Sequence, residues 1–205
     1  MEYKWLHWAR ELQSIAQAGL TFSTSDYDRD RYRKIRDLSV EILHEYTEID
    51  HRKIKELFAS ETGYQTPKVD IRAAVINGGR ILLVKEKVDG RWSMPGGWAD
   101  VNSSPSESAM RECFEEAGAK VLPKRIIAVH MADRHNPSKL AYTIYKIFIE
   151  CELVEKVFIE NTETLGAEFF DPANLPPLSE SRTTADQIMI CFEAKKHNLF
   201  QPVFD

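Results

Sequence analysis

The 205-residue sequence predicts an α+β protein, in which a small all-helical domain precedes a sandwich-like domain of mixed strands and helices. Over residues 1–63, apolar side chains recur at three- and four-residue intervals, which is typical of amphipathic helices. From residue 67 to residue 205, short apolar runs replace this pattern, with a few helical segments between them. The runs do not alternate regularly with helices, which favours an α+β domain over a doubly wound sheet.

Composition limits the partners and the location of the protein. The net charge of −5 argues against a stable complex with nucleic acid, which requires a basic face, but allows a small anionic substrate held through a metal. The opening segment is charged from residue 2, and no apolar run approaches the roughly 20 residues of a membrane span. Cys113, Cys151 and Cys191 lie far apart among apolar residues, so we expect buried reduced thiols in a cytoplasmic protein.

Three helices are expected in the N-terminal domain. The first covers residues 3–20, with Trp5 and Trp8 on an apolar stripe that predicts core or interface. The segment STSD at 23–26 offers cap residues for a second helix, whose periodic apolar residues continue to Tyr46. Asp50 is suited to cap a short third helix through Phe58.

The second domain opens with a predicted hairpin. Strand-like runs at 69–76 and 80–84 flank Asn77-Gly78-Gly79, a strong turn signal. Residues 87–97 are predicted to be a loop, and a helix is predicted over 105–117. The remaining expected elements are strands at 125–131, 141–154 and 166–170, a proline-rich loop at 171–180, and a closing helix at 184–197.

The helix at 105–117 has unusually complete end signals. Ser104 occupies the N-cap position, Pro105 the first helical position, and Glu107 completes a capping box. Gly118 stands where a left-handed terminator is expected. At 100° per residue the carboxylates of this helix share one edge, beside an apolar face that predicts docking on a sheet. The carboxylates are Glu112, Glu115 and Glu116, and the apolar face comprises Ala109, Met110, Cys113, Phe114 and Ala117.

Clustered carboxylates on a helix need an explanation, because like charges three or four residues apart each cost about 0.2–0.5 kcal/mol. One explanation is a solvated acidic face. The other is a divalent cation such as Mg²⁺ or Mn²⁺, which prefers carboxylate oxygens and suits phosphate chemistry.

The spacing of Gly97, Arg111-Glu112, Glu115-Glu116 and Gly118 resembles the signature of the Nudix hydrolases. Every fixed position of that signature is filled except the first glutamate, where this chain has Ser103. The resemblance implies a Nudix α/β/α sandwich with a mixed sheet. It also implies metal ligation by Glu112, Glu115, Glu116 and a backbone carbonyl near Gly96, with an altered geometry or ion number where Ser103 replaces glutamate.

Further roles follow from the same resemblance. Many family members carry a glutamate shortly before a late aromatic pair, and Glu163 fits this position best, with Glu168 second. Arg111 is expected to orient a neighbouring glutamate, so the catalytic set is Glu112, Glu115, Glu116, Arg111 and Glu163. The general base is not identified, because that role depends on reach to a water.

The sequence evidence for substrate contacts is weaker. Trp98 follows the Gly-Gly turn and could cover a base or simply pack. Arg91 and Arg134 could contact phosphate, as could Lys139, although solvated surface charge is the alternative for each. His135, like His130, flanks a polar loop and could touch a phosphate or leaving group, or be structural.

The resemblance implies hydrolysis of a nucleoside diphosphate joined to another moiety. The leader LQSIAQAGLTFSTSDYDRDRY resembles a bacterial subfamily that includes CDP-choline and ADP-ribose pyrophosphatases. We expect CDP-choline as substrate, giving CMP and phosphocholine. The alternatives are ADP-ribose hydrolysis, hydrolysis of RNA ends, and a non-catalytic nucleotide-binding module. A homodimer formed with the help of the helical domain is also expected.

Overall fold

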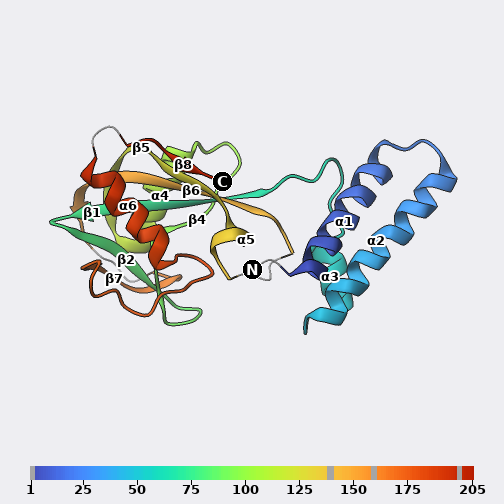
Figure 1. Cartoon of the computed structure of the whole chain (residues 1–205), viewed down its shortest axis with the longest axis horizontal. Coiled ribbons are helices and arrows are strands. Elements are labelled where there is room, and N and C mark those ends of the chain that lie inside the picture. The colour runs from blue at the N-terminus through green and yellow to red at the C-terminus, as the bar shows by residue number, and fades with distance from the viewer. Residues whose placement is uncertain (1–2, 138–140, 158–160, 198–199) are drawn as a thin grey trace. The chain divides into compact units, whose positions relative to one another are not determined.

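A computed structural model describes residues 3–137, 141–157, 161–197 and 200–205. The chain forms two compact units, Met1–Pro67 with Lys139–Thr143, and Lys68–Ser138 with Ile144–Asp205 (Figure 1). Within the described residues, no helix combines the length and apolar character that a membrane crossing requires.

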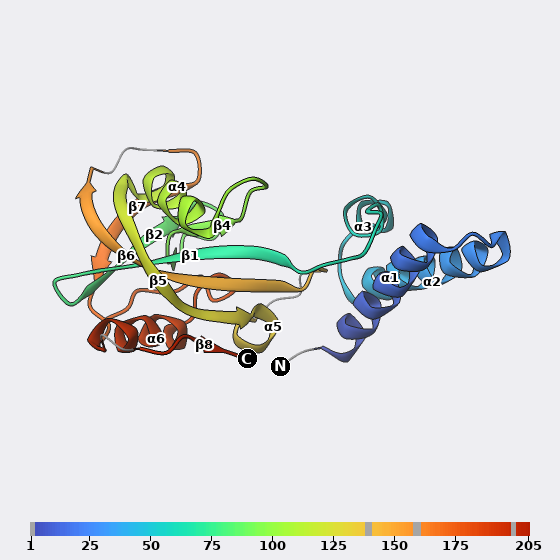
Figure 2. The ribbon, with the colours of Figure 1, turned by 90° about the horizontal axis from the view of Figure 1, so that it is seen from above.

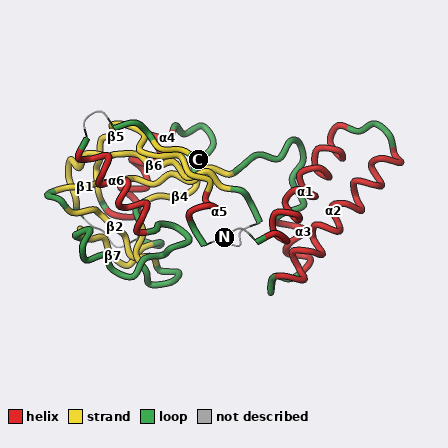
Figure 3. Tube along the Cα trace, in the orientation of Figure 1, coloured by secondary structure: helices red, strands yellow, loops and turns green. Residues whose placement is uncertain are grey.

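The first unit is helical, as predicted, and comprises α1 (Lys4–Phe22), α2 (Asp26–Tyr46) and α3 (His51–Leu57) (Figure 3). The Ser25 hydroxyl caps α2 by accepting from the Asp28 N–H, and the Asp50 carboxylate caps α3. Buried apolar side chains from the unit form one cluster, which comprises Leu6, Ala9, Val40, Leu43, Ile54, Phe58 and Ala59.

A segment distant in sequence completes this helical unit. The Arg10 guanidinium donates to the carbonyl oxygens of Ala141 and Tyr142, at 3.3 and 3.1 Å. The Phe58 ring meets the Tyr142 ring edge-on, with centroids 6.3 Å apart. This segment lies between two strands of the second unit in the sequence, but it packs as part of the helical unit.

The second unit is built on a mixed sheet, in the order β3-β2-β1-β6-β5-β8, with β4 paired to β1 and β7 to β2. The pairs β1·β6 and β5·β8 are parallel, and the others are antiparallel. The strands are β1 (Lys68–Asn77), β2 (Arg80–Glu86), β3 (Trp92–Ser93), β4 (Gly96–Trp98), β5 (Ala119–Met131), β6 (Ile144–Lys156), β7 (Thr164–Phe170) and β8 (Val203–Phe204).

The predicted hairpin joins β1 to β2. Asn77 pairs with Arg80, which leaves Gly78 and Gly79 as a two-residue turn with φ of 55° and 74°. Positive φ at both central residues gives the turn a twist that matches that of the strands.

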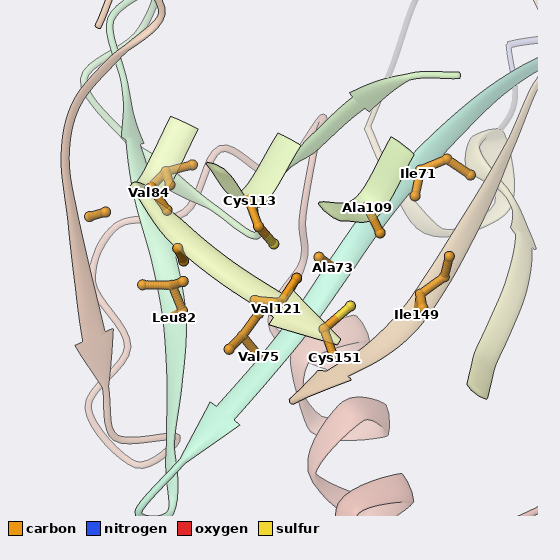
Figure 4. Packing of buried hydrophobic residues seen from close by; sticks show 13 residues of the cluster. Ile71, Ala73, Val75, Leu82, Val84, Ala109, Cys113, Val121, Ile149 and Cys151 are labelled. Carbon is orange, nitrogen blue, oxygen red and sulfur yellow. The ribbon is translucent and has the colours of Figure 1, made fainter. Parts of the chain in front are cut away.

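Helices cover both faces of the sheet, which gives the α/β/α arrangement (Figure 2). Alternate residues of β1 divide between α4 (Pro105–Ala117) and α6 (Ala185–Lys196). Ile71 and Ala73 pack with Ala109 and Cys113 of α4 (Figure 4), whereas Ala74 clusters with residues of α6. All three cysteines are free and buried, as expected.

Four short elements differ from the sequence predictions. The expected loop at 87–97 contains β3 and part of β4, and residues 132–135 form the one-turn helix α5 (Ala132–His135). The strand β8 near the C-terminus pairs with β5. Strands of two or three residues are defined by the partner they bond to, so periodicity does not reveal them.

Candidate active site

The helix α4 has the ends that the sequence predicts. The Ser104 hydroxyl accepts from the Glu107 N–H at 3.2 Å, while Glu107 accepts from the Ser104 N–H at 2.8 Å. Gly118 has φ of 60° and its N–H donates to the Phe114 carbonyl. Both helix ends are therefore satisfied locally, which fixes the angle at which the glutamates leave the helix.

The buried face of α4 differs from the predicted one. Phe114 is 54% exposed, whereas Glu112 and Glu116 are only 6% and 5% exposed. Glu115 is the one member of the acidic triplet that faces solvent. The expectation that Phe114 docks on the sheet was wrong, because two carboxylates take the inward positions beside Ala109 and Cys113.

Arg111 connects the acidic side chains at the surface of this site. Its guanidinium lies 3.0 Å from the Glu112 carboxylate and 3.1 Å from the Glu115 carboxylate. It also pairs with Asp100 at 3.0 Å, in the loop that contains Ser103. Arg111 thus contacts and orients neighbouring carboxylates.

The Gly96-Gly97 turn provides the floor of the site. On β1, the Ala73 N–H donates to the Pro95 carbonyl oxygen, so the next pair, Arg72 with Gly96, is a non-bonded pair whose backbone groups point away from the ladder. The Gly96 N–H donates to Glu116 Oε2 at 2.8 Å. A Cβ placed on Gly97 would lie 3.3 Å from Glu112 Oε1, so both buried carboxylates contact this turn.

Electrostatics favour a cation here. Burial raises the pKa of Glu116 to about 8, although Arg72 and the Gly96 N–H partly offset this effect. Burial also raises the pKa of Glu112, against the effect of Arg111. Two adjacent buried acids with incomplete compensation are an oxygen donor set that fits a divalent ion.

Glu163 lies close to this set. It is exposed, and its charge is among the influences that raise the pKa of Glu112. The neighbouring Thr164 hydroxyl donates to the Glu116 carbonyl oxygen at 2.7 Å, which places this segment against the C-terminal half of α4. Glu168 lies on β7, where it pairs with Leu83 of β2, and it is also exposed.

Other predicted substrate contacts are distributed around the sheet. Trp98 is half exposed on β4, directly opposite Asp70 of β1. Arg91 is exposed in the loop before β3, and Arg134 is exposed on α5. Lys139 lies outside the described residues.

His135 belongs to a different group of side chains. Its Nε2 lies 2.8 Å from the Asp205 carboxylate, and its ring stacks on His130 at 3.8 Å with 9° between the planes. The three side chains offer donor atoms within 4.8 Å of one another. Nitrogen lone pairs lie in the ring plane, and one ion cannot lie in two parallel planes, so this arrangement does not suit a shared metal.

Sequence reasoning missed a group of buried charges next to the site. Arg72 makes a bidentate pair with Asp70, and its Nη1 donates to the Met94 carbonyl oxygen at 3.0 Å. Lys146 of β6 lies opposite Asp70 of β1, and burial lowers the pKa of Lys146 to about 7. The available signal was charge at Asp70, Arg72 and Lys146 inside otherwise apolar strands.

A mixed-sheet α/β/α domain, with two buried carboxylates of a capped helix against a Gly-Gly turn, has the features of a metal-dependent hydrolase. The chain belongs to the Nudix family: residues 66–190 match the family described as NUDIX domain. Residues 3–58 match the family described as UDP-X-like, N-terminal oligomerisation domain.

Known proteins resemble the chain along its length. The Bacillus subtilis (strain 168) protein YjhB, provisionally named an ADP-ribose pyrophosphatase, is 40% identical over 205 residues, which cover 100% of this chain and 99% of that protein. A solved ADP-ribose pyrophosphatase from Streptococcus suis is 40% identical with a TM-score of 0.64, covering 68% of this chain and all of that one. A solved UDP-X diphosphatase is 30% identical with a TM-score of 0.65, covering 98% of both chains.

Proposed function

We propose that this protein hydrolyses the pyrophosphate bond of a nucleoside diphosphate sugar, with ADP-ribose as the first candidate and AMP and ribose 5-phosphate as products. The observation that carries this proposal is the buried pair Glu112 and Glu116 against the Gly96-Gly97 turn. The names of the two 40% identical relatives support ADP-ribose within that class.

The proposed ion is Mg²⁺ or Mn²⁺, with Glu112, Glu116 and Glu115 as its carboxylate ligands and the outward-facing Gly96 carbonyl as a further candidate. Bound there, it would neutralise phosphoryl oxygens and favour ionisation of a water. The Gly96 N–H holds Glu116, and Arg111 holds Glu112 and Glu115.

Glu163 is the proposed base that takes a proton from the attacking water. It is exposed, which gives it access to solvent, and it lies within electrostatic reach of Glu112. Loss of Glu163 should therefore lower turnover more than it lowers affinity for the metal.

CDP-choline, the substrate expected from the leader sequence, becomes a secondary candidate. The relatives are named for ADP-ribose and UDP-X, and none of those described above is named for CDP-choline. The helical leader therefore supports a subfamily whose members differ in the group attached to the nucleotide.

A substrate panel tests the proposal. The protein with Mg²⁺ or Mn²⁺ is offered ADP-ribose, a UDP-sugar, CDP-choline and 5′-triphosphorylated RNA, and the products are separated by chromatography. We expect AMP from ADP-ribose at the highest kcat/KM. A preference for CDP-choline would change the substrate but keep the reaction, whereas binding without turnover of any member would support a nucleotide-binding module.

We further propose that α1 forms an interface between copies of the chain. Trp8, Ile15 and Phe22 are 58%, 45% and 68% exposed, and their seven-residue spacing places them on one face of the helix. The double variant Trp8→Glu/Phe22→Glu should convert a dimer to a monomer in light scattering. Val88→Glu, at an exposed apolar residue of the other unit, is the control, and an unchanged mass for the double variant would contradict this interface.

A further inference from the structure

The loop between β7 and α6 is held firmly against the site. The Ser179 N–H donates to the Trp92 carbonyl at 2.8 Å, and the Thr183 hydroxyl accepts from the Met94 N–H at 3.1 Å. These bonds attach the loop to the strand β3 and to Met94, which lies two residues before Gly96. Arg182 lies between these two attachment points, and its N–H donates to the Ser179 carbonyl oxygen at 2.8 Å, so its backbone is fixed.

A buried lysine adds a second attachment. Lys146 of β6 is 2% exposed, and its ammonium donates to the carbonyl oxygens of Ser181, at 3.0 Å, and Arg182. The loop is thus tied to β3 on one side and to β6 on the other. Such a loop loses little conformational entropy when a ligand binds to it.

The side chain of Arg182 is oriented by a buried carboxylate. Its Nε lies 3.1 Å from Glu86 Oε1, and the Ser93 hydroxyl donates to the same oxygen at 2.6 Å. Glu86 is 5% exposed, whereas the Arg182 side chain is 36% exposed. The carboxylate is immobilised below, and the guanidinium extends from it toward solvent.

The outer nitrogens of this guanidinium are available. Among the described residues, Glu86 is the one ion-pair partner of Arg182, through Nε, and the two terminal nitrogens donate no hydrogen bond. Its charge contributes to the lowered pKa values of Asp89 and Lys146. A planar guanidinium held through Nε presents its two terminal groups in the fork that matches phosphate oxygens.

Glu86 links Arg182 to the acidic helix. The charge of Glu86 contributes to the raised pKa of Glu116, so the two carboxylates are within electrostatic reach. Met94 contacts Thr183 and is two residues from Gly96, whose N–H binds Glu116. The cation and the proposed metal ligands therefore border the same region.

We propose that Arg182, oriented by Glu86, binds the pyrophosphate group of the substrate beside the Nudix helix. The identity of this ligand rests on the proposed function. The alternative is an ion pair that only stabilises the fold. A partly exposed pair is worth about 0–1 kcal/mol, and burial of a carboxylate is costly, so stability alone explains the pair poorly.

The test uses methylene diphosphonate, a pyrophosphate analogue that cannot be hydrolysed, titrated calorimetrically at saturating Mg²⁺. Because no turnover is needed, the result is independent of which nucleotide is cleaved. Arg182→Met should weaken binding by about tenfold to a hundredfold, the effect of losing hydrogen bonds to a charged group. Arg182→Lys should lose less, and Arg80→Met, at an exposed arginine of the hairpin between β1 and β2, less than twofold.

The variant Glu86→Gln tests whether Glu86 orients the Arg182 side chain or only contributes negative charge near the site. Removing a negative charge beside the site should tighten binding of an anion if only the summed charge matters. If Glu86 orients Arg182, the same change should weaken binding about threefold or more. Unchanged melting temperatures for the variants would exclude loss of folding as the cause.

Several results would overturn the proposal. They are no binding by the unmodified protein, a change under twofold for Arg182→Met, equal losses for Arg182→Met and Arg80→Met, or unchanged or tighter binding for Glu86→Gln. A failure of nucleotide hydrolysis with the expected binding pattern would instead count against the proposed function alone.

Discussion

Replacement of Glu116 by glutamine is expected to reduce metal-dependent hydrolysis by about a thousandfold or more. The amide retains the shape and an oxygen for the Gly96 N–H, but it lacks the charge that a divalent ion requires. A bound ion is worth several kcal/mol to the transition state, and each 1.36 kcal/mol is a factor of ten in rate. The measurement is kcat/KM for ADP-ribose at saturating Mg²⁺.

The same variant should change how stability depends on pH. In the metal-free protein the pKa of Glu116 is raised from 4.5 to about 8, so between these values the folded state holds more protons than the unfolded state. The free energy of unfolding must then fall as pH rises through this range, by a few kcal/mol as an order of magnitude. Glu116→Gln removes this contribution, and Mg²⁺ should oppose the fall in the unmodified protein.

Urea unfolding at pH 5 and pH 8.5, with and without Mg²⁺, measures this difference. Glu152→Gln is the control, because it removes an exposed acid of β6 that pairs with Lys124. A parallel pH dependence in Glu116→Gln and the control would contradict the assignment of Glu116 as a buried, uncompensated acid. Full activity in Glu116→Gln would remove the basis for the proposed reaction.

The first and last residues of α4 could be predicted because both ends carry local sequence signals. Its start is set by Ser104, Pro105 and Glu107, and its end by Gly118, so each boundary has its own hydrogen bonds. The buried face was not predictable in the same way. Charged residues of a helix are expected to face solvent, whereas Glu116 faces inward toward Arg72 of β1 and the Gly96 N–H of β4.

The other site residues that the sequence did not predict depend on contacts between segments that are distant in the chain. Arg182 and Glu86 are 96 positions apart, and neither belongs to a motif, so their pairing follows from the path of the loop along β3. Asp70 and Arg72 were visible as charges within an apolar strand, but their role depends on the neighbouring strands. Likewise, Asp100 pairs with Arg111 only because of the turn before α4.

Substitution of Gly96 by alanine is expected to destabilise the fold by about 3 kcal/mol or more. Gly96 has φ of 148°, and a Cβ there would lie 1.9 Å from the Ile71 carbonyl oxygen and 2.9 Å from the Arg72 Cα. Neither is the end of a flexible side chain, so β4 would have to move away from β1. Backbone strain of this kind and overpacking each cost about 1–3 kcal/mol.

Gly97→Ala is the matched control at the adjacent position. Its added Cβ would meet Glu112 Oε1 at 3.3 Å, and the flexible carboxylate can withdraw without moving the strands. We expect a loss of stability below about 1 kcal/mol in Gly97→Ala, but a loss of about 10–100-fold in activity because a proposed metal ligand is displaced. Urea midpoints for both variants, with Mg²⁺ affinity for Gly97→Ala, test this contrast. Equal midpoints would show that β4 has more freedom than its contact with Ile71 implies, and the close approach of the turn to β1 would then not explain the need for glycine at 96.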